Sequence, residues 1–306
     1  MTSPGQMDRL VGFVGIGAMG EPMVGRLSAA GFEVHAYDLD RRRAELVGKL
    51  PGVAVASSLG DLAKAPVVIC MLPSSSAVRE VATTPGGLFE SMAKGSLIID
   101  MGSSEPAQTT ELGRAAEAAG LALADAPVSG GVARAKTGEL TIMFGGSTEL
   151  LERSRRILEA MGSNVMHVGP LSSGHALKAL NNLLSAVGLA AASEVIEVGR
   201  RYGLDPHTML DVINHSTGRN HATETKVAQF VLSGTYASGF ALRLMLKDIK
   251  TAINLARSLD VDCAMGEACL GLWEEAGRRL PADSDQTRIA LMSAAIQKPA
   301  AAEKAW

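Results

Sequence analysis

Short apolar runs alternate with polar, helix-forming stretches between about residue 9 and residue 168. The runs favour β-strands because many are β-branched, and the stretches between them are rich in Ala, Leu, Glu and Arg. Strands that alternate with helices predict βαβ units and a mostly parallel sheet. The expected strands are "LVGFVG", "FEVHAYD", "VVICML", "SLIID", "LALADAP", "LTIMFGG" and "NVMHVG".

The strand pattern stops after about residue 170, and the later segments all have helical patterns. Gly203, Pro206 and Gly218 separate several of them. We therefore expect an α/β domain over residues 9–168 and an all-helical domain over 169–300, joined by a long interdomain helix. The helices expected after residue 170 are 174–203, 206–215, 222–232, 240–258, 263–281 and 284–296.

Composition favours a globular protein that acts on small molecules. Hydrophobic residues make up 47% of the 306 residues, and the net charge of -3 gives no argument for nucleic acid or an anionic membrane as a partner. Three cysteines without C-x-x-C spacing suggest reduced thiols. No signal peptide is evident at the N-terminus, and no apolar run reaches membrane-spanning length. We expect a cytoplasmic location.

The segment "GIGAMG" carries three glycines in G-x-G-x-x-G spacing, Gly15, Gly17 and Gly20, directly after a predicted strand. The first glycine permits a tight turn, the second lets a pyrophosphate approach the backbone, and the third allows close packing of the helix on the strand. With Ala18 and Met19 between them, they predict a dinucleotide site at a helix N-terminus in a Rossmann-type doubly wound sheet.

Asp38 ends the second expected strand, where a carboxylate can accept hydrogen bonds from the adenine ribose and repel a 2′-phosphate. This placement favours NAD over NADP. Arg41, Arg42 and Arg43 follow directly and leave NADP open as the alternative.

Two further loops follow expected strands, at the sheet edge where ligands bind in open α/β folds. One carries Leu72 and Pro73, and the other carries Ser103. The alternative interpretation is that Pro73 merely ends a strand and Ser103 caps a helix.

The long helix expected at 174–203 has an unusual polar stripe near its start. Lys178, Asn181, Asn182 and Ser185 fall on one face at about 100° per residue, whereas the middle of the helix is apolar. A solvated first turn is the simplest explanation, and a site facing a cleft is the alternative.

Four blocks in order resemble the β-hydroxyacid dehydrogenase family, which includes 3-hydroxyisobutyrate dehydrogenase and tartronate semialdehyde reductase. The resemblance covers nearly the whole chain. The blocks are "GFVGIGAMGEPM" at 12–23, "DAPVSGGVARAKTGELTIMFGG" at 125–146, "GHALKALNN" at 174–182 and "GFALRLMLKDIKTA" at 239–252.

The resemblance implies roles for individual residues. Lys178 matches the catalytic lysine, and Asn182 matches the residue that binds and orients the substrate. Lys247 matches the lysine that approaches cofactor and substrate from the helical domain. Ser103 keeps the hydroxyl near the nicotinamide ribose, although Gly102 stands where the family has serine. The loop that matches the family's carboxylate-binding site is Ser129, Gly130 and Gly131.

The residues themselves make this chemistry reasonable. Oxidation of a hydroxyl by hydride transfer needs a base, and desolvation in an apolar cleft together with the positive charge of Lys247 would lower the pKa of Lys178. The "PVSGG" loop offers a hydroxyl and unobstructed N–H groups to a carboxylate. The alternative interpretation of this loop is a simple glycine turn. The alternative interpretation of Lys247 and Asp248 is a surface ion pair.

The expected activity is NAD(P)-dependent hydride transfer between a short 3-hydroxy acid, or its semialdehyde, and nicotinamide. Imine reduction and a non-catalytic nucleotide-binding scaffold are the alternatives. His175, His215 and His221 lack metal-site spacing, so we expect no metal. Arg219, Asn220 and His221 are candidates for the substrate pocket. The apolar helical domain predicts a homodimer or homotetramer.

Overall fold

The computed structural model describes residues 9–294 and divides into two compact units, one ending at Lys178 and the other beginning at Ala179. The division falls inside the long helix, whereas the strand pattern alone placed the boundary before it. The first turns of that helix belong to the sheet unit because they pack on its strands, as described below.

The sheet unit is built on one sheet in the order β3-β2-β1-β4-β5-β6-β8-β7, with β9 also paired to β8. The pairs from β3 through to β6 are parallel. The sequence-based expectation of a mostly parallel, doubly wound sheet is thereby confirmed. The strands are β1 (Leu10–Val14), β2 (Glu33–Tyr37), β3 (Val53–Val55), β4 (Val67–Cys70), β5 (Leu97–Asp100), β6 (Ala122–Asp125), β7 (Val128–Ser129), β8 (Thr141–Gly145) and β9 (Asn164–Gly169).

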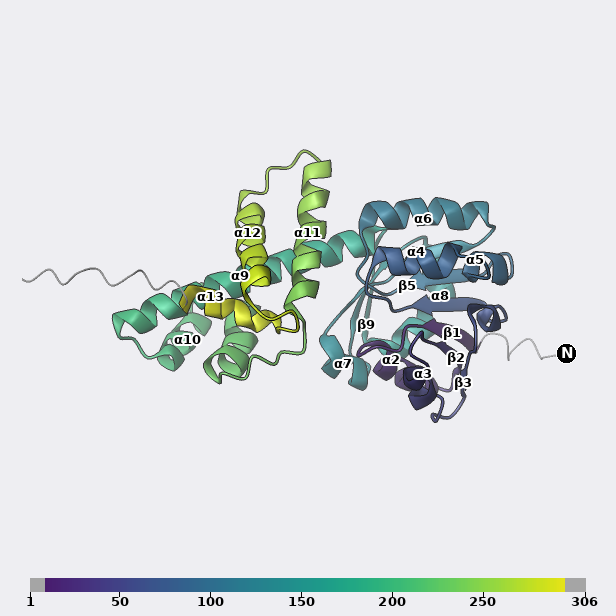
Figure 1. The fold of residues 1–306 in the computed structure, drawn as a ribbon, viewed down its shortest axis with the longest axis horizontal. Helices are drawn as coiled ribbons and strands as arrows, with labels where there is room; N and C mark the ends of the chain where they lie inside the picture. Colours follow the sequence, from purple (N-terminus) through teal and green to yellow (C-terminus); the bar gives the residue numbers. More distant parts are fainter. Residues whose placement is uncertain (1–8, 295–306) are drawn as a thin grey trace, which may run out of the picture. The chain divides into compact units, whose positions relative to one another are not determined.

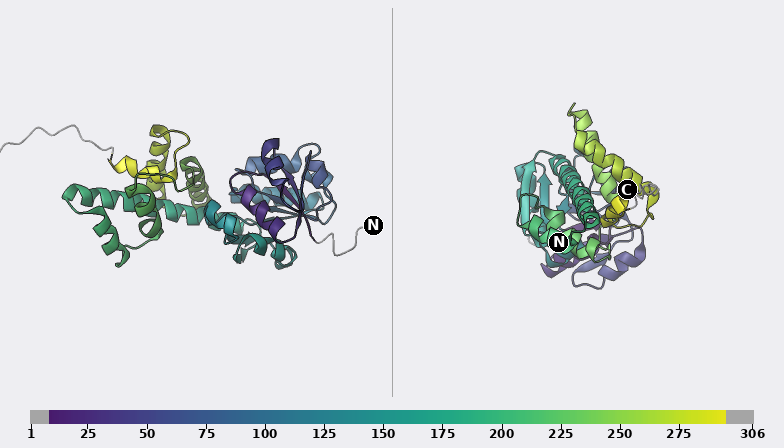
Figure 2. Two further views of the ribbon diagram at one scale, coloured as in Figure 1. Left: turned by 90° about the horizontal axis from the view of Figure 1, so that it is seen from below. Right: turned by 90° about the vertical axis from the view of Figure 1, so that its left-hand side faces the viewer.

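Helices cover both faces of this sheet (Figures 1 and 2). One face is covered by α2 (Gly20–Ala29), α7 (Gly131–Thr137) and α8 (Thr148–Met161). The other is covered by the 3-10 helix η1 (Leu59–Leu62), α4 (Ser75–Thr83), α5 (Leu88–Ser91) and α6 (Pro106–Ala118). The short helix α3 (Arg41–Val47) follows β2.

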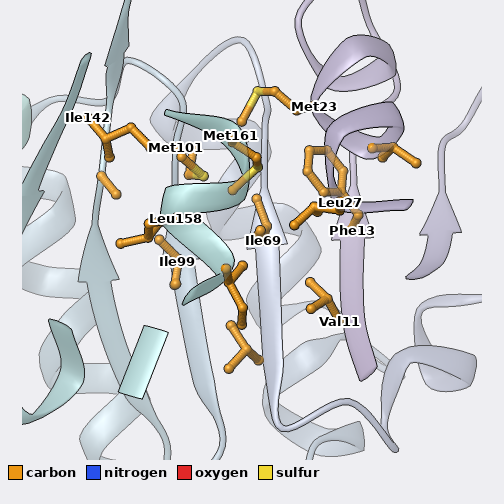
Figure 3. Close-up of a cluster of buried hydrophobic side chains, with 14 of the residues drawn as sticks. Val11, Phe13, Met23, Leu27, Ile69, Ile99, Met101, Ile142, Leu158 and Met161 are labelled. Atoms are coloured by element: carbon orange, nitrogen blue, oxygen red, sulfur yellow. The ribbon is translucent and has the colours of Figure 1, made fainter. Parts of the chain in front are cut away.

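The larger core of the sheet unit lies beneath α2 and α8. Figure 3 shows Met23 and Leu27 of α2 and Met161 of α8 among the strand residues Phe13 and Ile69. All five side chains are fully buried. Because the central strands are covered on both faces, β4 and β5 are continuous buried runs without a polar alternation.

Two strands were missed in the sequence because they are too short to leave a pattern. The strand β3 has three residues at the edge of the sheet, and β7 has two. The pairs β6–β8 and β7–β8 are antiparallel. Ser129 therefore ends a strand before the two glycines that follow it.

The helix α9 (Ser173–Tyr202) is long and apolar enough, by length and composition alone, to cross a membrane. The expectation that no apolar run reaches that length is therefore wrong for this helix. Half of its most apolar window is buried inside the protein. Ala186, Leu189 and Ile196 lie in the core of the helical unit, which is the pattern of a core helix.

The helical unit is folded around the second part of α9. Trp273 and Ile249 are fully buried in its core. The described part of the segment expected as one helix at 284–296 is a 3-10 turn followed by a short α-helix, and Asp285 caps the turn at Thr287. Residues 295 and 296 lie outside the described residues. The elements are α10 (Pro206–Asn214), the π-helix η2 (Ala222–Leu232), α11 (Leu242–Ser258), α12 (Ala264–Arg279), η3 (Gln286–Ile289) and α13 (Ala290–Ala294).

Candidate active site

The glycine-rich loop between β1 and α2 is shaped by backbone contacts that exclude larger residues. Gly15 has a φ of 98°, and a Cβ there would lie 2.4 Å from the carbonyl oxygen of Met71. A Cβ on Gly20 would lie 1.9 Å from the Gly15 carbonyl oxygen. The N-cap residue of α2, Met19, makes no side-chain cap hydrogen bond. The loop and the helix N-terminus fit the pyrophosphate of a dinucleotide.

Asp38 ties the end of β2 to this loop. Its carboxylate accepts hydrogen bonds from the N–H groups of Ile16, at 2.6 Å, and Asp40, at 2.7 Å. Both oxygens are thereby fixed beside the glycine loop. Arg43 lies nearby, because a Cβ on Gly17 would be 3.6 Å from its Nη1 atom.

The loops after β4 and β5 contact each other at the same edge of the sheet. A Cβ on Gly102 would lie 2.6 Å from the carbonyl oxygen of Leu72, so glycine is required where the family has serine. The N–H of Gly102 donates to Asp100 at 2.9 Å, and the Ser104 hydroxyl donates to the same carboxylate at 2.6 Å. These bonds hold the half-buried Ser103 between two fixed neighbours.

The two other predicted binding segments, one at Pro73 and one at Gly130 and Gly131, are both exposed. Pro73 is exposed beside Ser74, whose hydroxyl accepts a hydrogen bond from the N–H of Ala77 and caps α4. Gly130 and Gly131 are exposed with φ values of 128° and 65°, conformations that favour glycine. The turn thus leaves its backbone open next to Ser129.

The start of α9 is bound to the end of β6. Asp125 accepts hydrogen bonds of 2.7 Å from the N–H groups of Ser172 and His175. Gly174 packs so closely that a Cβ would lie 2.2 Å from the carbonyl oxygen of Met143. Lys178 follows one turn later and is half-buried. Within the sheet unit, the predicted catalytic lysine therefore emerges at the edge that carries the glycine loop and Ser103.

A second group of predicted residues comes together inside the helical unit. The amide Nδ2 of Asn182 donates to the Asp248 carboxylate at 2.6 Å. Lys247 Nζ lies 3.1 Å from the other oxygen of Asp248. Asp248 is 1% exposed, so the interpretation of this pair as a surface ion pair is wrong for the aspartate. The carboxylate holds both candidate substrate-binding side chains.

The sequence around Asp248 contains a pattern that indicates its burial, although Asp248 was not predicted as a site residue. On α11, Met245, Asp248, Ile249 and Ala252 follow the three-to-four spacing of a buried helix face, and all four are buried. A carboxylate on such a face needs hydrogen-bonding partners. That requirement points to a polar neighbour such as Asn182.

The rest of the polar stripe on α9 has other partners. Ser185 accepts a hydrogen bond of 3.0 Å from the buried Lys226 on η2, and Asn181 is exposed. Lys178 and Asn182 are the members of the stripe to which the family resemblance assigns roles.

Asn220, a candidate for the substrate pocket, lies just before η2. Its side-chain carbonyl accepts hydrogen bonds from the N–H groups of Ala222 and Thr223 at the start of that helix.

Residues 9–294 contain no group of three His, Cys, Asp or Glu side chains placed to hold a metal ion. Cys70, Cys263 and Cys269 are free thiols. Burial raises the pKa of Cys269 to about 11, which keeps that thiol protonated and unreactive near neutral pH.

Comparisons with known proteins place this arrangement in a family. Residues 10–169 match the family described as the NAD binding domain of 6-phosphogluconate dehydrogenase, and residues 172–292 match NAD-binding of NADP-dependent 3-hydroxyisobutyrate dehydrogenase. The 2-(hydroxymethyl)glutarate dehydrogenase of Eubacterium barkeri is 34% identical over 264 residues, covering 86% of this chain and 88% of the relative. The chain belongs to the β-hydroxyacid dehydrogenase family.

Further relatives agree with this membership. Mitochondrial 3-hydroxyisobutyrate dehydrogenase of Mus musculus is 36% identical, covering 84% of this chain and 78% of the relative. The structure of Mycobacterium tuberculosis 3-hydroxyisobutyrate dehydrogenase with L-serine has a TM-score of 0.85 at 29% identity, covering 92% of this chain and 98% of that one. As a β-hydroxyacid dehydrogenase, the protein is a nicotinamide-dependent oxidoreductase of hydroxy acids.

Imine reductases and reductive aminases are more distant from this β-hydroxyacid dehydrogenase. Their structures are 16% to 20% identical, with TM-scores of 0.56 to 0.59. Such values show a shared fold only. The interpretation of the chain as an imine reductase therefore gains no support from them.

Proposed function

We propose that this protein oxidises a short 3-hydroxy acid, or reduces the corresponding semialdehyde, with Lys178 as the general acid and base. The observation that carries the proposal is the attachment of α9 to Asp125. It brings Lys178 to the sheet edge where the glycine loop and Ser103 lie. The dehydrogenases to which the chain is similar act on 3-hydroxyisobutyrate, 2-(hydroxymethyl)glutarate and L-serine, by their names.

Lys178 moves the proton in this proposal. A bound nicotinamide would accept the hydride in oxidation and donate it in reduction. In oxidation, the neutral amine of Lys178 takes the proton of the substrate hydroxyl, and in reduction the ammonium returns it. Proton transfer at a fixed distance requires a fixed amine, and the tight packing of Gly174 supplies a rigid helix start.

The remaining groups bind and orient the substrate. The open backbone of Gly130 and Gly131, beside the Ser129 hydroxyl, is suited to the substrate carboxylate. Asn182 presents an amide held by Asp248 on the face of α9 that carries Lys178 one turn earlier. An amide that Asp248 already holds loses less entropy on binding a substrate oxygen than a mobile side chain would.

NAD is the proposed cofactor, in preference to NADP. Both oxygens of Asp38 are fixed at the end of β2, and their negative charge would repel a 2′-phosphate. The nearby arginines are already engaged, because Arg42 and Arg43 lie 3.1 Å and 3.8 Å from the carboxylate of Asp40. Their positive charge is thus partly neutralised near the ribose position.

A substrate panel tests the function. The full-length protein is mixed with NAD or NADP and with 3-hydroxyisobutyrate, L-serine, 3-hydroxypropionate, glycerate, threonate, 4-hydroxybutyrate or 2-(hydroxymethyl)glutarate, and absorbance is followed at 340 nm. Semialdehydes are tested in reverse with NADH or NADPH. We expect turnover of at least one 3-hydroxy acid. Nucleotide binding without turnover of any acid or semialdehyde would contradict the proposal and favour the scaffold alternative.

A further inference from the structure

His175 is a buried imidazole three residues before Lys178, and the function proposed above gives it no part. Its Nδ1 lies 2.8 Å from the hydroxyl of Thr109 on α6. Its Nε2 has no hydrogen-bond partner among the described residues and lies 3.7 Å from Oδ2 of Asp100. Nδ1 is also 3.7 Å from Oδ2 of Asp125. The ring is therefore enclosed by groups from α6 and from the ends of β5 and β6.

The hydrogen-bond pattern places a hydrogen on Nε2. If the Thr109 hydroxyl donates to Nδ1, a neutral imidazole carries its hydrogen on Nε2. The hydroxyl can instead donate to the Glu105 carbonyl, 3.2 Å away, and accept from Nδ1–H. A bare Nε2 lone pair would then face the acceptor oxygens of Asp100, which is unfavourable, so the first arrangement is preferred. In the preferred arrangement Nε2–H faces Asp100.

Asp100 and Asp125 are two buried carboxylates on neighbouring strands. They are register partners in the parallel pair β5–β6, and they are 3% and 0% exposed. Burial raises the pKa of the Asp125 carboxyl, and the nearby Asp100 carboxylate raises it further. His175 and the hydrogen bonds from two backbone N–H groups act in the opposite direction. Buried like charges need hydrogen-bond donors or a cation between them.

His175 lies 3.7 Å from a carboxylate oxygen of each of these two residues. Arg79 and Asp100 line the same small pocket, but the Arg79 guanidinium pairs with Glu111 at 2.9 Å. The imidazole, by contrast, faces both carboxylates.

Each carboxylate also fixes one functional segment. Asp125 binds the N–H groups of Ser172 and His175 at the start of the helix that carries Lys178. Asp100 binds the N–H of Gly102 and the hydroxyl of Ser104, which flank Ser103. The ring thus connects the segment of the lysine to the segment of the proposed nicotinamide-side hydroxyl.

We propose that His175 is a positioning residue for proton transfer. By bridging Asp100 and Asp125, it holds Lys178 in a fixed place relative to the Ser103 loop. The inference rests on the proposed function, because it assumes that Lys178 carries the proton. A displacement of about 1 Å at reacting groups is enough to cost roughly 100-fold in rate.

The variants His175→Gln, Thr109→Val and Thr109→Ser test this role. Gln keeps an amide donor but cannot reach both carboxylates as the ring does, and Val keeps the branched shape of Thr without its hydroxyl. His167→Gln is the matched control, since His167 is an exposed histidine of the same unit, bonded to the Gly146 carbonyl. The readouts are kcat per NADH-binding site, KM, the dissociation constant of NADH by fluorescence, and Tm.

We expect His175→Gln to lower kcat per binding site by about 10- to 100-fold, with NADH affinity changed by less than about twofold. Thr109→Val should lower kcat in the same direction, and Thr109→Ser should retain more of it. A purely structural residue would instead change Tm and the number of binding sites without changing kcat per site, and that result would overturn the inference.

The two proposals fail in distinguishable ways. If Lys178→Ala keeps wild-type turnover, the proposed function loses its proton-transfer residue and the inference falls with it. If Lys178→Ala is inactive while His175→Gln has wild-type kcat, the inference about His175 alone is overturned. Should His175→Gln fail to fold, wild-type kcat in Thr109→Val overturns the inference in its place.

Discussion

The amide of Asn182 on α9 donates a 2.6 Å hydrogen bond to the carboxylate of Asp248 on α11, which also lies 3.1 Å from Lys247 Nζ. This one buried carboxylate therefore sets the orientation of two candidate substrate-binding side chains. Hydrogen bonds to charged groups contribute about 1.5–3 kcal/mol, and removal of the charge leaves the partners without a fixed geometry.

Asp248→Asn should therefore lower kcat/KM by about 10- to 100-fold, measured by NADH formation at saturating NAD. Asp260→Asn is the control, because Asp260 is exposed just after α11 and has a φ of 54°, which asparagine adopts well. A wild-type kcat/KM for Asp248→Asn would show that the Asn182 orientation does not matter for turnover.

Asp38→Asn should weaken the discrimination against NADP. Loss of the charge removes the repulsion of a 2′-phosphate, so the ratio of kcat/KM for NAD to that for NADP should fall by about tenfold, or about 1.4 kcal/mol. The two kcat/KM values are measured from initial rates with each cofactor, for the wild type and for the variant. Glu33→Gln, an exposed change at the opposite end of β2, should leave the ratio as it is. An unchanged ratio in Asp38→Asn would argue against this basis for cofactor choice.

Gly174→Ala should destabilise the sheet unit by about 1–3 kcal/mol, because its Cβ would lie 2.2 Å from the Met143 carbonyl oxygen and 2.8 Å from Asp125. Gly25→Ala in α2 is the matched change in open space, with no atom within 4 Å of the new Cβ. It should stabilise by up to about 1 kcal/mol, since alanine favours helix. Urea unfolding measures both, and equal effects would contradict the tight packing of the α9 start.

Glu197 should make stability depend on pH in the acid range. Hydrogen bonds from Arg200 and then Arg201 lower its pKa from 4.5 to about 2. A carboxylate with a lowered pKa stabilises the fold above its unfolded value and loses that effect as the pH falls through the folded value. Glu197→Gln should therefore lower the unfolding midpoint by about 1–2 °C at pH 7, with a difference that vanishes near pH 2. A difference independent of pH would contradict this assignment.

The sequence predicted the sheet and the nucleotide loop well because both depend on local patterns. Continuous buried strands such as β4 and the spacing of Gly15, Gly17 and Gly20 are visible in a single stretch of sequence. The two-residue β7 left no such pattern. Likewise, no local pattern divides residues 286–294 into η3 and α13, since Asp285, which caps η3, contacts Ser238 as well as Thr287.

The polar networks of the site were harder to predict because their members lie far apart in sequence. The bond from Asn182 to Asp248 joins residues 66 positions apart, and that from Thr109 to His175 does the same. Sequence alone identified Lys178 and Asn182 as one face of a helix, but not which carboxylates hold that helix. Asp125 was visible in the sequence only as the first residue of a block.

The most direct test of the account is NADH formation by the wild type and by Lys178→Ala, with the 3-hydroxy acid that reacts best and with NADH binding measured for both proteins. We predict that Lys178→Ala binds NADH as the wild type does but loses at least about 100-fold in kcat, the lower range for general acid–base catalysis. Wild-type kcat in Lys178→Ala would contradict the central claim.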